Sequence, residues 1–185
     1  LAALDASTAR GFISGLQRAI GAVRAIPVPV ICRIQGACIG GAMELAAGCD
    51  LRIASERASF SMPEVRVGIP SVIEAALLPR LMGRGRAGWL VLSGETIDAL
   101  TARQWGFVEK LIAADDLDHA VEAAVNAVLA ADPAAVRLQK RLLADWDRLS
   151  LDDAIAASID AFAEAFETGD PSTRMRDILA KRRKS

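Results

Sequence analysis

The sequence contains no tyrosine and a single histidine, His119, and aromatic residues make up only 4% of the chain. One histidine, together with the absence of a Gly-x-Ser-x-Gly sequence, argues against a Ser-His-Asp hydrolase. No cysteine–histidine cluster has the spacing of a metal site. The formal net charge is −1, so no strong overall field would attract nucleic acid or an anionic membrane. We therefore expect no metal, no nucleic-acid partner and no membrane partner.

Long apolar runs are missing as well. No stretch of eighteen uncharged apolar residues occurs, so no membrane span is expected, and no signal-peptide pattern is present. The three cysteines, Cys32, Cys38 and Cys49, are odd in number and form no Cys-x-x-Cys pair. We interpret them as buried free thiols of a reducing compartment, and we expect the protein to be cytoplasmic.

The composition that remains, 52% apolar and 24% charged, is that of a globular chain with a sizeable core. Apolar periodicity and the positions of Gly and Pro predict an α/β pattern. The predicted helices cover residues 5–25, 40–48, 72–82, 85–92 and 101–105, and the predicted strands cover residues 28–34, 49–55, 58–62 and 107–112. From Leu117 onward the pattern is helical only. This change predicts a mixed core over residues 1–115 and a C-terminal helical region over residues 116–185.

The sequence GGAMELAAGCD places a glycine pair, Gly40 and Gly41, at the start of a predicted helix, with Glu44 one turn further on. The first turn of a helix carries backbone N–H groups without intrahelical partners, and glycine lets a ligand approach them closely. Such an N–H can stabilise an oxygen that gains negative charge during a reaction. The alternative interpretation is an ordinary helix start with a favourable acid in its first turn.

A second carboxylate, Glu64, follows Pro63 at the end of a predicted strand. The segment between Glu44 and Glu64 is one supersecondary unit, so the two acids could face each other across a pocket. The alternative for Glu64 is a solvated acid in a loop. Two neighbouring carboxylates are groups that can exchange protons with a reacting molecule.

The stretch from Pro29 to Pro70, PVICRIQGACIGGAMELAAGCDLRIASERASFSMPEVRVGIP, resembles the crotonase family of enoyl-CoA hydratases and isomerases. The family pattern is G-x-x-x-G-G-x-x-E-L-x-x-x-C-D followed by A-x-x-A-x-F-x-x-P-E. The later LSGETIDALTARQWGFVEKLI and the C-terminal MRDILAKRRK are similar to further family segments. The resemblance implies a crotonase-type α/β spiral of ββα units with a C-terminal helical region that builds trimers or hexamers.

By this resemblance, Glu44 activates a water molecule for attack at the β-carbon of an enoyl-CoA thioester, and Glu64 supplies a proton to the α-carbon. The N–H of Gly41 contacts the thioester oxygen, and Gly40 lines the substrate pocket. No cofactor is implied, because coenzyme A enters as part of the acyl-CoA substrate. Lys181 and Arg182 are candidate contacts for the CoA phosphates, with a solvated tail as the alternative.

The chain departs from the family pattern at PSVIEA, which runs from Pro70 to Ala75 and replaces a glycine-rich helix start. Ser71 then stands where a glycine N–H normally helps to hold the water. Glu74 is new near the expected pocket, and we assign Ser71 and Glu74 to that pocket. The alternative for Glu74 is a surface or salt-bridging residue of the predicted helix.

A second departure concerns the beginning of the chain. Nothing in residues 1–25 resembles the N-terminal family segment, which supplies a second oxyanion N–H and much of the adenine site. We expect that segment to be missing or omitted, and a chain that truly begins at Leu1 to be nearly inactive. An intact mass near 19.5 kDa would indicate such a truncation.

The function predicted from the sequence is enoyl-CoA hydratase, which adds water to a trans-2-enoyl-CoA to give a 3-hydroxyacyl-CoA in fatty-acid or related acyl-CoA metabolism. The alternatives within the enzyme class are an enoyl-CoA isomerase and another enolate-stabilising acyl-CoA enzyme. The alternatives from another class are a catalytically silent assembly partner and an RNA-binding family member.

Overall fold

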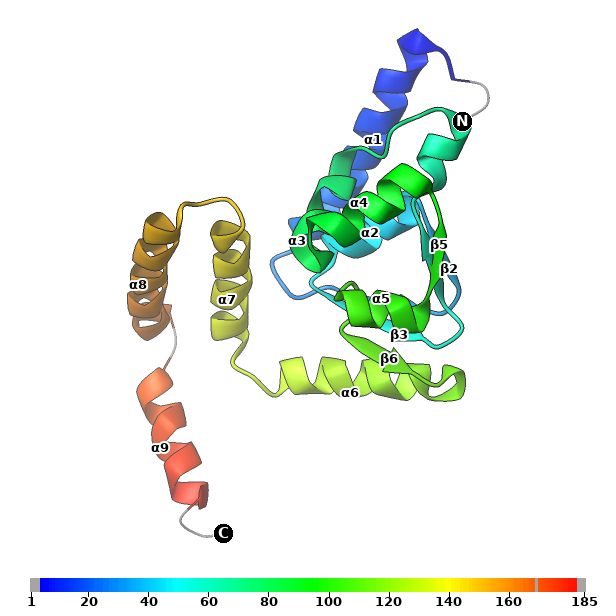
Figure 1. The fold of residues 1–185 in the computed structure, drawn as a ribbon. Helices are drawn as coiled ribbons and strands as arrows, with labels where there is room; N and C mark the ends of the chain where they lie inside the picture. Colours follow the sequence, from blue (N-terminus) through cyan, green and yellow to red (C-terminus); the bar gives the residue numbers. More distant parts are fainter. Residues whose placement is uncertain (1–3, 169, 183–185) are drawn as a thin grey trace. The chain divides into compact units, whose positions relative to one another are not determined.

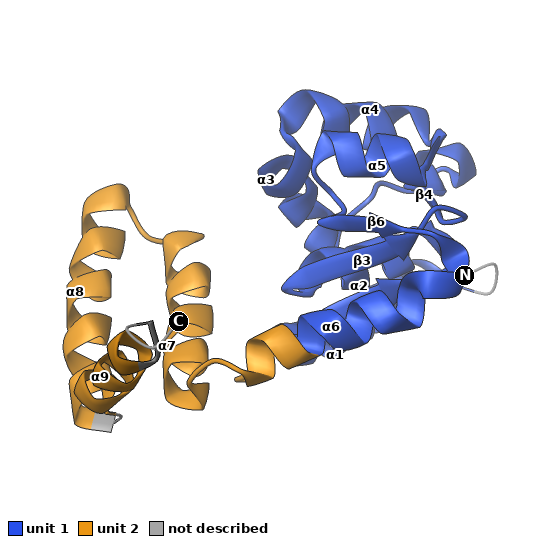
Figure 2. Ribbon diagram, turned by 90° about the horizontal axis from the view of Figure 1, so that it is seen from below, with its two compact units in different colours: residues 1–26, 30–125 blue, residues 27–29, 126–185 orange. Residues whose placement is uncertain are grey.

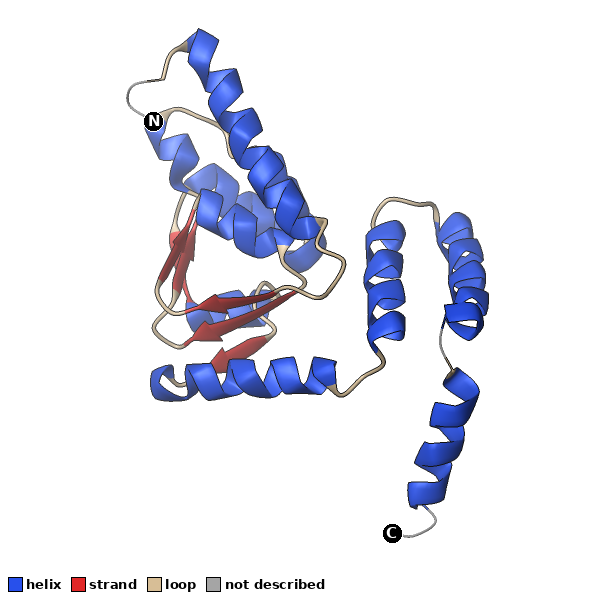
Figure 3. Cartoon of the chain, turned by 180° about the vertical axis from the view of Figure 1, so that it is seen from behind, coloured by secondary structure: helices blue, strands red, loops and turns tan. Residues whose placement is uncertain are grey.

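The structure is a computed structural model that describes residues 4–168 and 170–182. The chain divides into two compact units (Figure 2), one comprising residues 1–26 and 30–125 and the other comprising residues 27–29 and 126–185. The domain boundary predicted between residues 115 and 116 remains a prediction. The strands of the described residues all lie in the first unit (Figure 3).

The first unit contains two three-stranded sheets. The first sheet is parallel, in the order β1 (Ile31–Ile34), β3 (Leu51–Ser55) and β6 (Lys110–Ile112). The second sheet has the order β2 (Ala37–Ile39), β4 (Ser59–Ser61) and β5 (Thr96–Asp98). In it β2 and β4 run parallel, and β4 and β5 run antiparallel. Each of the pairs β1–β2 and β3–β4 therefore sends one strand to each sheet. The strands β2 and β5 were not predicted.

Two helices lie side by side next to these sheets (Figure 1), namely α1 (Ala6–Arg24) and α2 (Gly41–Gly48), which connects β2 to β3. Asp5 caps α1 by accepting hydrogen bonds from the backbone N–H groups of Ser7 and Thr8. The fully buried Ile20 of α1 packs against Gly48, where an added Cβ would stand only 3.0 Å from Ile20 Cγ2. The absence of a side chain at Gly48 therefore allows the two helices to approach closely.

The segment between β4 and β6 is mainly helical. It contains the 3₁₀ turns η1 (Pro63–Val67) and η2 (Ile73–Leu77), and the helices α3 (Leu78–Met82), α4 (Arg84–Ser93) and α5 (Ala99–Trp105). The single helix predicted over residues 72–82 is wrong in its first half, because η2 is a 3₁₀ turn and Ile73 has a φ of 42°. That backbone conformation is incompatible with a continuous right-handed α-helix.

Arg52 of β3 ties the buried end of α2 to the sheet. Its side chain is 2% exposed and donates hydrogen bonds to the carbonyl oxygens of Ala46 and Cys49, at the C-terminal end of α2, and of Phe107. It also forms an ion pair with Glu109. A guanidinium carries several fixed donors, so one arginine can satisfy carbonyl groups from two elements at once.

After β6 the described chain is helical, as predicted. A 3₁₀ turn, η3 (Ala114–Asp116), precedes α6 (Leu117–Leu129), α7 (Pro133–Trp146), α8 (Leu151–Thr168) and α9 (Pro171–Arg182). Within the second unit α7 and α8 pack together through an ion pair between Arg141 and Glu164 and a 3.0 Å hydrogen bond from Trp146 Nε1 to Ser158 Oγ. Among the described residues no helix combines the length and apolar character needed to cross a membrane.

Candidate active site

The start of α2 depends on a glycine conformation. Gly40 precedes the helix with φ 56° and ψ −121°, which is a region that residues with a Cβ rarely adopt. Its N–H donates to the carbonyl of Ser61 in β4 at 2.9 Å, and its own carbonyl accepts from the N–H of Glu44 at 3.0 Å. Gly41 is the first helical residue, a position for whose N–H the helix offers no acceptor. The turn thus links β4 to the first turn of α2.

Glu44 lies in this first turn, and its side chain is only 4% exposed. An added Cβ on Gly41 would stand 4.0 Å from Glu44 Oε2, so the carboxylate lies back over the helix start. Leu45, the residue after Glu44, is exposed and does not cover it. Backbone N–H groups near the carboxylate come from Val72 and Ala75, and both lower its pKa. The N–H of Ala75 also donates to the carbonyl of Val72 at 2.9 Å.

These surroundings change the acidity of Glu44. Burial raises the pKa of Glu44 to about 7, and the negative charges of Glu64 and, more weakly, Glu74 act in the same direction. The N–H groups of Ala75 and Val72 oppose the shift, because they stabilise the carboxylate form. Both protonation states of Glu44 are therefore populated near neutral pH, which suits a group that takes up and releases a proton.

Glu64 reaches the same helix start from η1, and it is half-buried. Its carboxylate is so close to Gly40 that a Cβ on that glycine would collide with Glu64 Oε1. The hydroxyl of Ser71 donates a 3.0 Å hydrogen bond to Glu64 Oε2. The two carboxylates predicted from the sequence thus lie beside neighbouring glycines, Glu64 at Gly40 and Glu44 at Gly41. The catalytic roles predicted for them remain proposals.

The segment from Ser71 to Ala75, which departs from the family pattern, contacts both acids. Ser71 binds Glu64 through its hydroxyl, and the N–H groups of Val72 and Ala75 bind Glu44. Between them Ile73 adopts a φ of 42°, which is rare for a β-branched residue and costs about 1–3 kcal/mol. Backbone strain of this kind tends to persist where the surrounding structure requires the conformation. Here the strained turn presents two amides to a buried carboxylate.

Glu74, in the same turn, is buried and not a surface residue, since its side chain is 5% exposed. Its Oε1 lies 3.8 Å from Nη1 of Arg24 in α1, which is a long ion pair. Its Oε2 is buried and has no hydrogen-bond partner among the described residues. Arg24 had not been identified from the sequence, because its stem packs on Gly48 of a different helix and no motif marks that contact.

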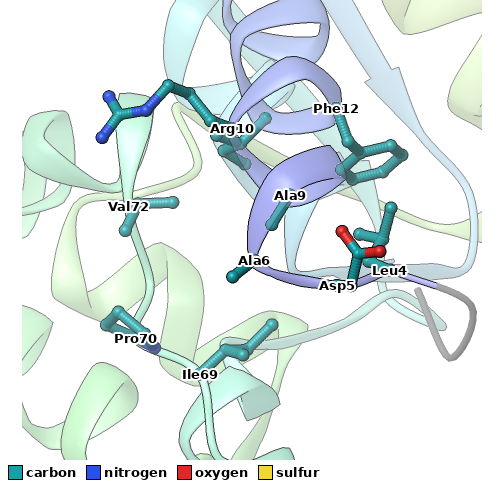
Figure 4. A pocket seen from close by; sticks show the side chains of 10 residues that line it. Leu4, Asp5, Ala6, Ala9, Arg10, Phe12, Ile69, Pro70 and Val72 are labelled. Atoms are coloured by element: carbon teal, nitrogen blue, oxygen red, sulfur yellow. The ribbon is translucent and has the colours of Figure 1, made fainter.

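An open pocket of about 670 Å³ adjoins this segment. Figure 4 shows its two walls, the first turns of α1 on one side and the loop that carries Ile69, Pro70 and Val72 on the other. Its lining is mainly apolar, with Leu4, Ala6, Ala9, Phe12, Ile13, Ile69, Pro70 and Val72. Glu44, Glu64 and Ser71 are not among the residues that line it. The pocket is connected to the acids only through the loop, in which Ser71 lies between Pro70 and Val72 and binds Glu64.

The remaining groups named from the sequence are Lys181, Arg182 and His119. The side chains of Lys181 and Arg182 lie outside the part of the chain that the structure describes. His119 is exposed on α6, which is a different element from those that carry Glu44 and Glu64. Within residues 4–168 and 170–182 no group of three or more His, Cys, Asp or Glu side chains is arranged to hold a metal ion.

Comparison with known proteins gives a consistent set of relatives. The enoyl-CoA hydratase/isomerase family matches residues 3–184 of the chain. The chain is 35% identical over 156 residues to the short-chain-enoyl-CoA hydratase of Clostridium acetobutylicum, covering 84% of this chain and 60% of that protein. It is 35% identical over 181 residues to the crotonyl-CoA hydratase of Syntrophomonas wolfei, covering 97% of this chain and 70% of that protein.

Solved structures show the same likeness. The crystal structure of an enoyl-CoA hydratase from Bacillus anthracis matches with a TM-score of 0.90 and 29% identity, over 99% of this chain and 70% of that one. The enoyl-CoA hydratase of Mycobacterium smegmatis matches with a TM-score of 0.89 and 27% identity, over 96% and 69% of the two chains. The chain therefore spans between about 60% and 70% of the length of the relatives described here.

Proposed function

The chain belongs to the enoyl-CoA hydratase/isomerase family and has the crotonase-like α/β fold with a mostly helical C-terminal part, and from this premise we propose that it hydrates a trans-2-enoyl-CoA to a 3-hydroxyacyl-CoA. The observation that carries the proposal is the pair of acids at the start of α2. Glu64 contacts Gly40, and Glu44 lies over Gly41. An isomerase needs only one acid to move a proton, whereas hydration uses two groups.

In the proposed reaction a water molecule lies between the two carboxylates. Glu44 takes a proton from the water while the water oxygen forms a bond to the β-carbon. The electron pair of the carbon–carbon double bond moves toward the thioester oxygen, where the N–H of Gly41 stabilises the enolate. Glu64, which carries a proton at this stage of the cycle, delivers it to the α-carbon, which restores the thioester carbonyl. The proton gained by Glu44 then passes through solvent to Glu64, so that both acids regain their starting states. One such N–H donor is typically worth about 3 kcal/mol of barrier.

The pocket beside Ser71 would take the acyl chain. Its lining is mainly apolar, and its loop wall continues into the residues that hold both acids. Binding of an apolar chain there would remove water from around the reacting carbons and strengthen the electrostatic contacts at the helix start. The CoA phosphates remain assigned, as a prediction, to Lys181 and Arg182.

A homo-oligomer, trimer or hexamer, is part of the proposal. One face of α8 exposes a continuous row of large apolar side chains, of which Leu151 is 76% and Phe162 is 70% exposed. The row consists of Leu151, Ile155, Ile159, Phe162 and Phe166. Such a row on one helix face is unfavourable in water and favours association with another surface.

The test of the function is Glu44→Gln, assayed by loss of the conjugated thioester absorbance with enoyl-CoA esters of several chain lengths. The amide keeps the size of the side chain but cannot take a proton from water, so hydration should fall at least about 10²-fold. Glu56→Gln is the matched control, because Glu56 is an exposed acid outside the site. Full hydration by Glu44→Gln would contradict the proposal, and retained double-bond migration with no hydration in either protein would indicate an isomerase.

A further inference from the structure

We propose that Glu74 is a third acid of this site, a positioning residue whose negative charge sets the pH at which Glu44 becomes available as a base. This inference rests on the proposed hydratase function, because it assigns to Glu44 the task of accepting a proton from water. Glu74 is not assigned to touch the substrate. Its role would be exerted through Glu44.

The position of Glu74 is unusual for a charged side chain. It is 5% exposed, Oε2 has no hydrogen-bond partner among the described residues, and Oε1 is 3.8 Å from its single counter-charge, Arg24. A buried carboxylate oxygen without a donor is unfavourable, because it has lost its water and gained no hydrogen bond in return. A purely structural acid would be expected to use both oxygens in hydrogen bonds. Because one oxygen of Glu74 has no partner, a structural role alone does not explain why a glutamate is buried here.

The backbone places Glu74 where its charge can act on Glu44. Glu74 belongs to η2, and η2 packs against α2, which carries Glu44. The N–H group of Ala75, the residue after Glu74, hydrogen-bonds to Glu44. The turn thus brings a negative charge and an amide donor to the same carboxylate.

The charged and titratable groups on the elements around α2 are few. Glu64 comes from η1, Glu74 from η2, and Arg24 from α1. Cys38 lies on β2, and burial raises the pKa of its thiol to about 11, so it is neutral near pH 7. Arg52 of β3 binds carbonyl groups at the far end of α2. Two carboxylates, those of Glu64 and Glu74, are therefore the charges that act on Glu44.

A like charge nearby disfavours the ionised form of a carboxyl group, and the effect is strong where solvent is excluded. The charges of Glu64 and Glu74 both raise the pKa of Glu44, although burial is the largest cause. A carboxylate whose pKa is near the working pH is a stronger base than an ordinary glutamate.

The first measurement follows the ionisation of Glu44 without using activity. The protein is labelled with ¹³C at the glutamate δ-carbons, and the Glu44 signal is assigned by its loss in Glu44→Gln. We expect the titration midpoint to fall in Glu74→Gln by about half a pH unit or more, which raises the ionised-to-protonated ratio about threefold. The midpoint should fall further in Glu64→Gln, since the Glu64 charge has the larger effect, and should be unchanged in Glu56→Gln.

The second measurement is the pH profile of kcat/KM for hydration. Because Glu44 must be ionised to accept a proton, activity should decline as pH falls through about 7 in the natural protein. In Glu74→Gln this decline should move to lower pH, so the ratio of activity at pH 6 to activity at pH 8 should rise about threefold. A residue with only a structural role would lower activity at all pH values alike.

Glu74→Met is the second variant, because an apolar side chain of similar length removes the charge and leaves no amide to satisfy. Whichever of Glu74→Gln and Glu74→Met folds shows whether the charge of Glu74 affects the ionisation of Glu44. An unchanged Glu44 midpoint in whichever variant folds, or a change no larger than in Glu56→Gln, would overturn the proposal. Absence of hydration with every enoyl-CoA would instead contradict the proposed function, and the Glu44 midpoint would still report on Glu74.

Discussion

The environment of Glu44 shows which chemical information a sequence carries and which it does not. The acid itself, the glycines before it and the second acid, Glu64, were singled out by spacing and by resemblance to a family. The donors that hold Glu44, the N–H groups of Val72 and Ala75, were not, because a backbone amide has no residue-type signature. The ion pair of Arg24 with Glu74 joins residues fifty positions apart in sequence, which no local pattern encodes.

Gly40 allows a sharp test of the helix start. Alanine there must adopt the φ of 56° and ψ of −121°, and its Cβ would collide with Glu64. Gly40→Ala should therefore lower the free energy of unfolding by about 2 kcal/mol and displace Glu64, so that hydration falls as well. Urea denaturation and the hydration assay measure the two effects.

Gly88 in α4 is the matched control. It lies inside a helix, and an added Cβ would meet no atom within 4 Å. Gly88→Ala should raise the free energy of unfolding by about 0.5–1 kcal/mol, because alanine is the better helix former. Equal stability of the two variants would show that the conformation of Gly40 places no special demand on the residue.

The helix α2 is fixed at both of its ends by neighbouring elements. At its start Gly40 binds β4 through the carbonyl of Ser61, and at its end Arg52 of β3 binds the carbonyl groups of Ala46 and Cys49. These contacts come from different sheets. The position of Glu44 therefore depends on two sheets and not only on the helix that carries it.

Arg52→Met should test the anchoring of the C-terminal end of α2. The apolar side chain fills similar space but leaves three carbonyl groups and Glu109 without their donor. We expect the free energy of unfolding to fall by about 3 kcal/mol, since removing one partner of a buried ion pair is strongly destabilising. Guanidinium denaturation measures the change. Arg57→Met, at an exposed site, should leave stability unchanged.

Among the secondary-structure elements, the long periodic helices were the most predictable. Helices α1, α6, α7 and α8 follow clear apolar stripes. The three-residue strands β2 and β5 were missed, whereas β4 and β6, of the same length, lie within longer segments that were predicted as strands. The segment after Pro70 was predicted as helix because its apolar residues fit that period, but Ile73 turns the backbone out of it.

The chain as a whole combines a mixed α/β unit with a helical unit, and both parts of this description were accessible from the sequence. Alternating helix and strand signals predicted the α/β character of the first part, and uninterrupted helical periodicity predicted the helical character of the chain after Leu117, whereas the domain boundary drawn at residue 115 stays a prediction. The assignment of individual strands to two sheets was not accessible, since pairing between distant segments leaves little local trace.

The association proposed for α8 can be tested by comparing two substitutions on opposite sides of this helix. Phe162→Lys places a charge in the middle of the exposed apolar row, whereas Asp160→Lys places the same residue on the polar side of α8. Sedimentation velocity should show a smaller assembly for Phe162→Lys and an unchanged one for Asp160→Lys, because an unpaired charge in a buried interface is costly. A monomeric natural chain, or equal behaviour of both variants, would contradict the proposed homo-oligomer.

The two amides that bind Glu44 have a further use. The N–H groups of Val72 and Ala75 favour the ionised form of Glu44, so their interaction with its side chain is stronger when that side chain has lost its proton. An amide bound to a carboxylate exchanges its hydrogen for deuterium more slowly than one released to solvent. Amide exchange always becomes faster as pH rises, because hydroxide catalyses it. The exchange rates of these two amides should show an additional change with pH that follows the ionisation of Glu44. Two backbone hydrogens in this turn therefore serve as an isotopic reporter on the chemistry of a buried acid.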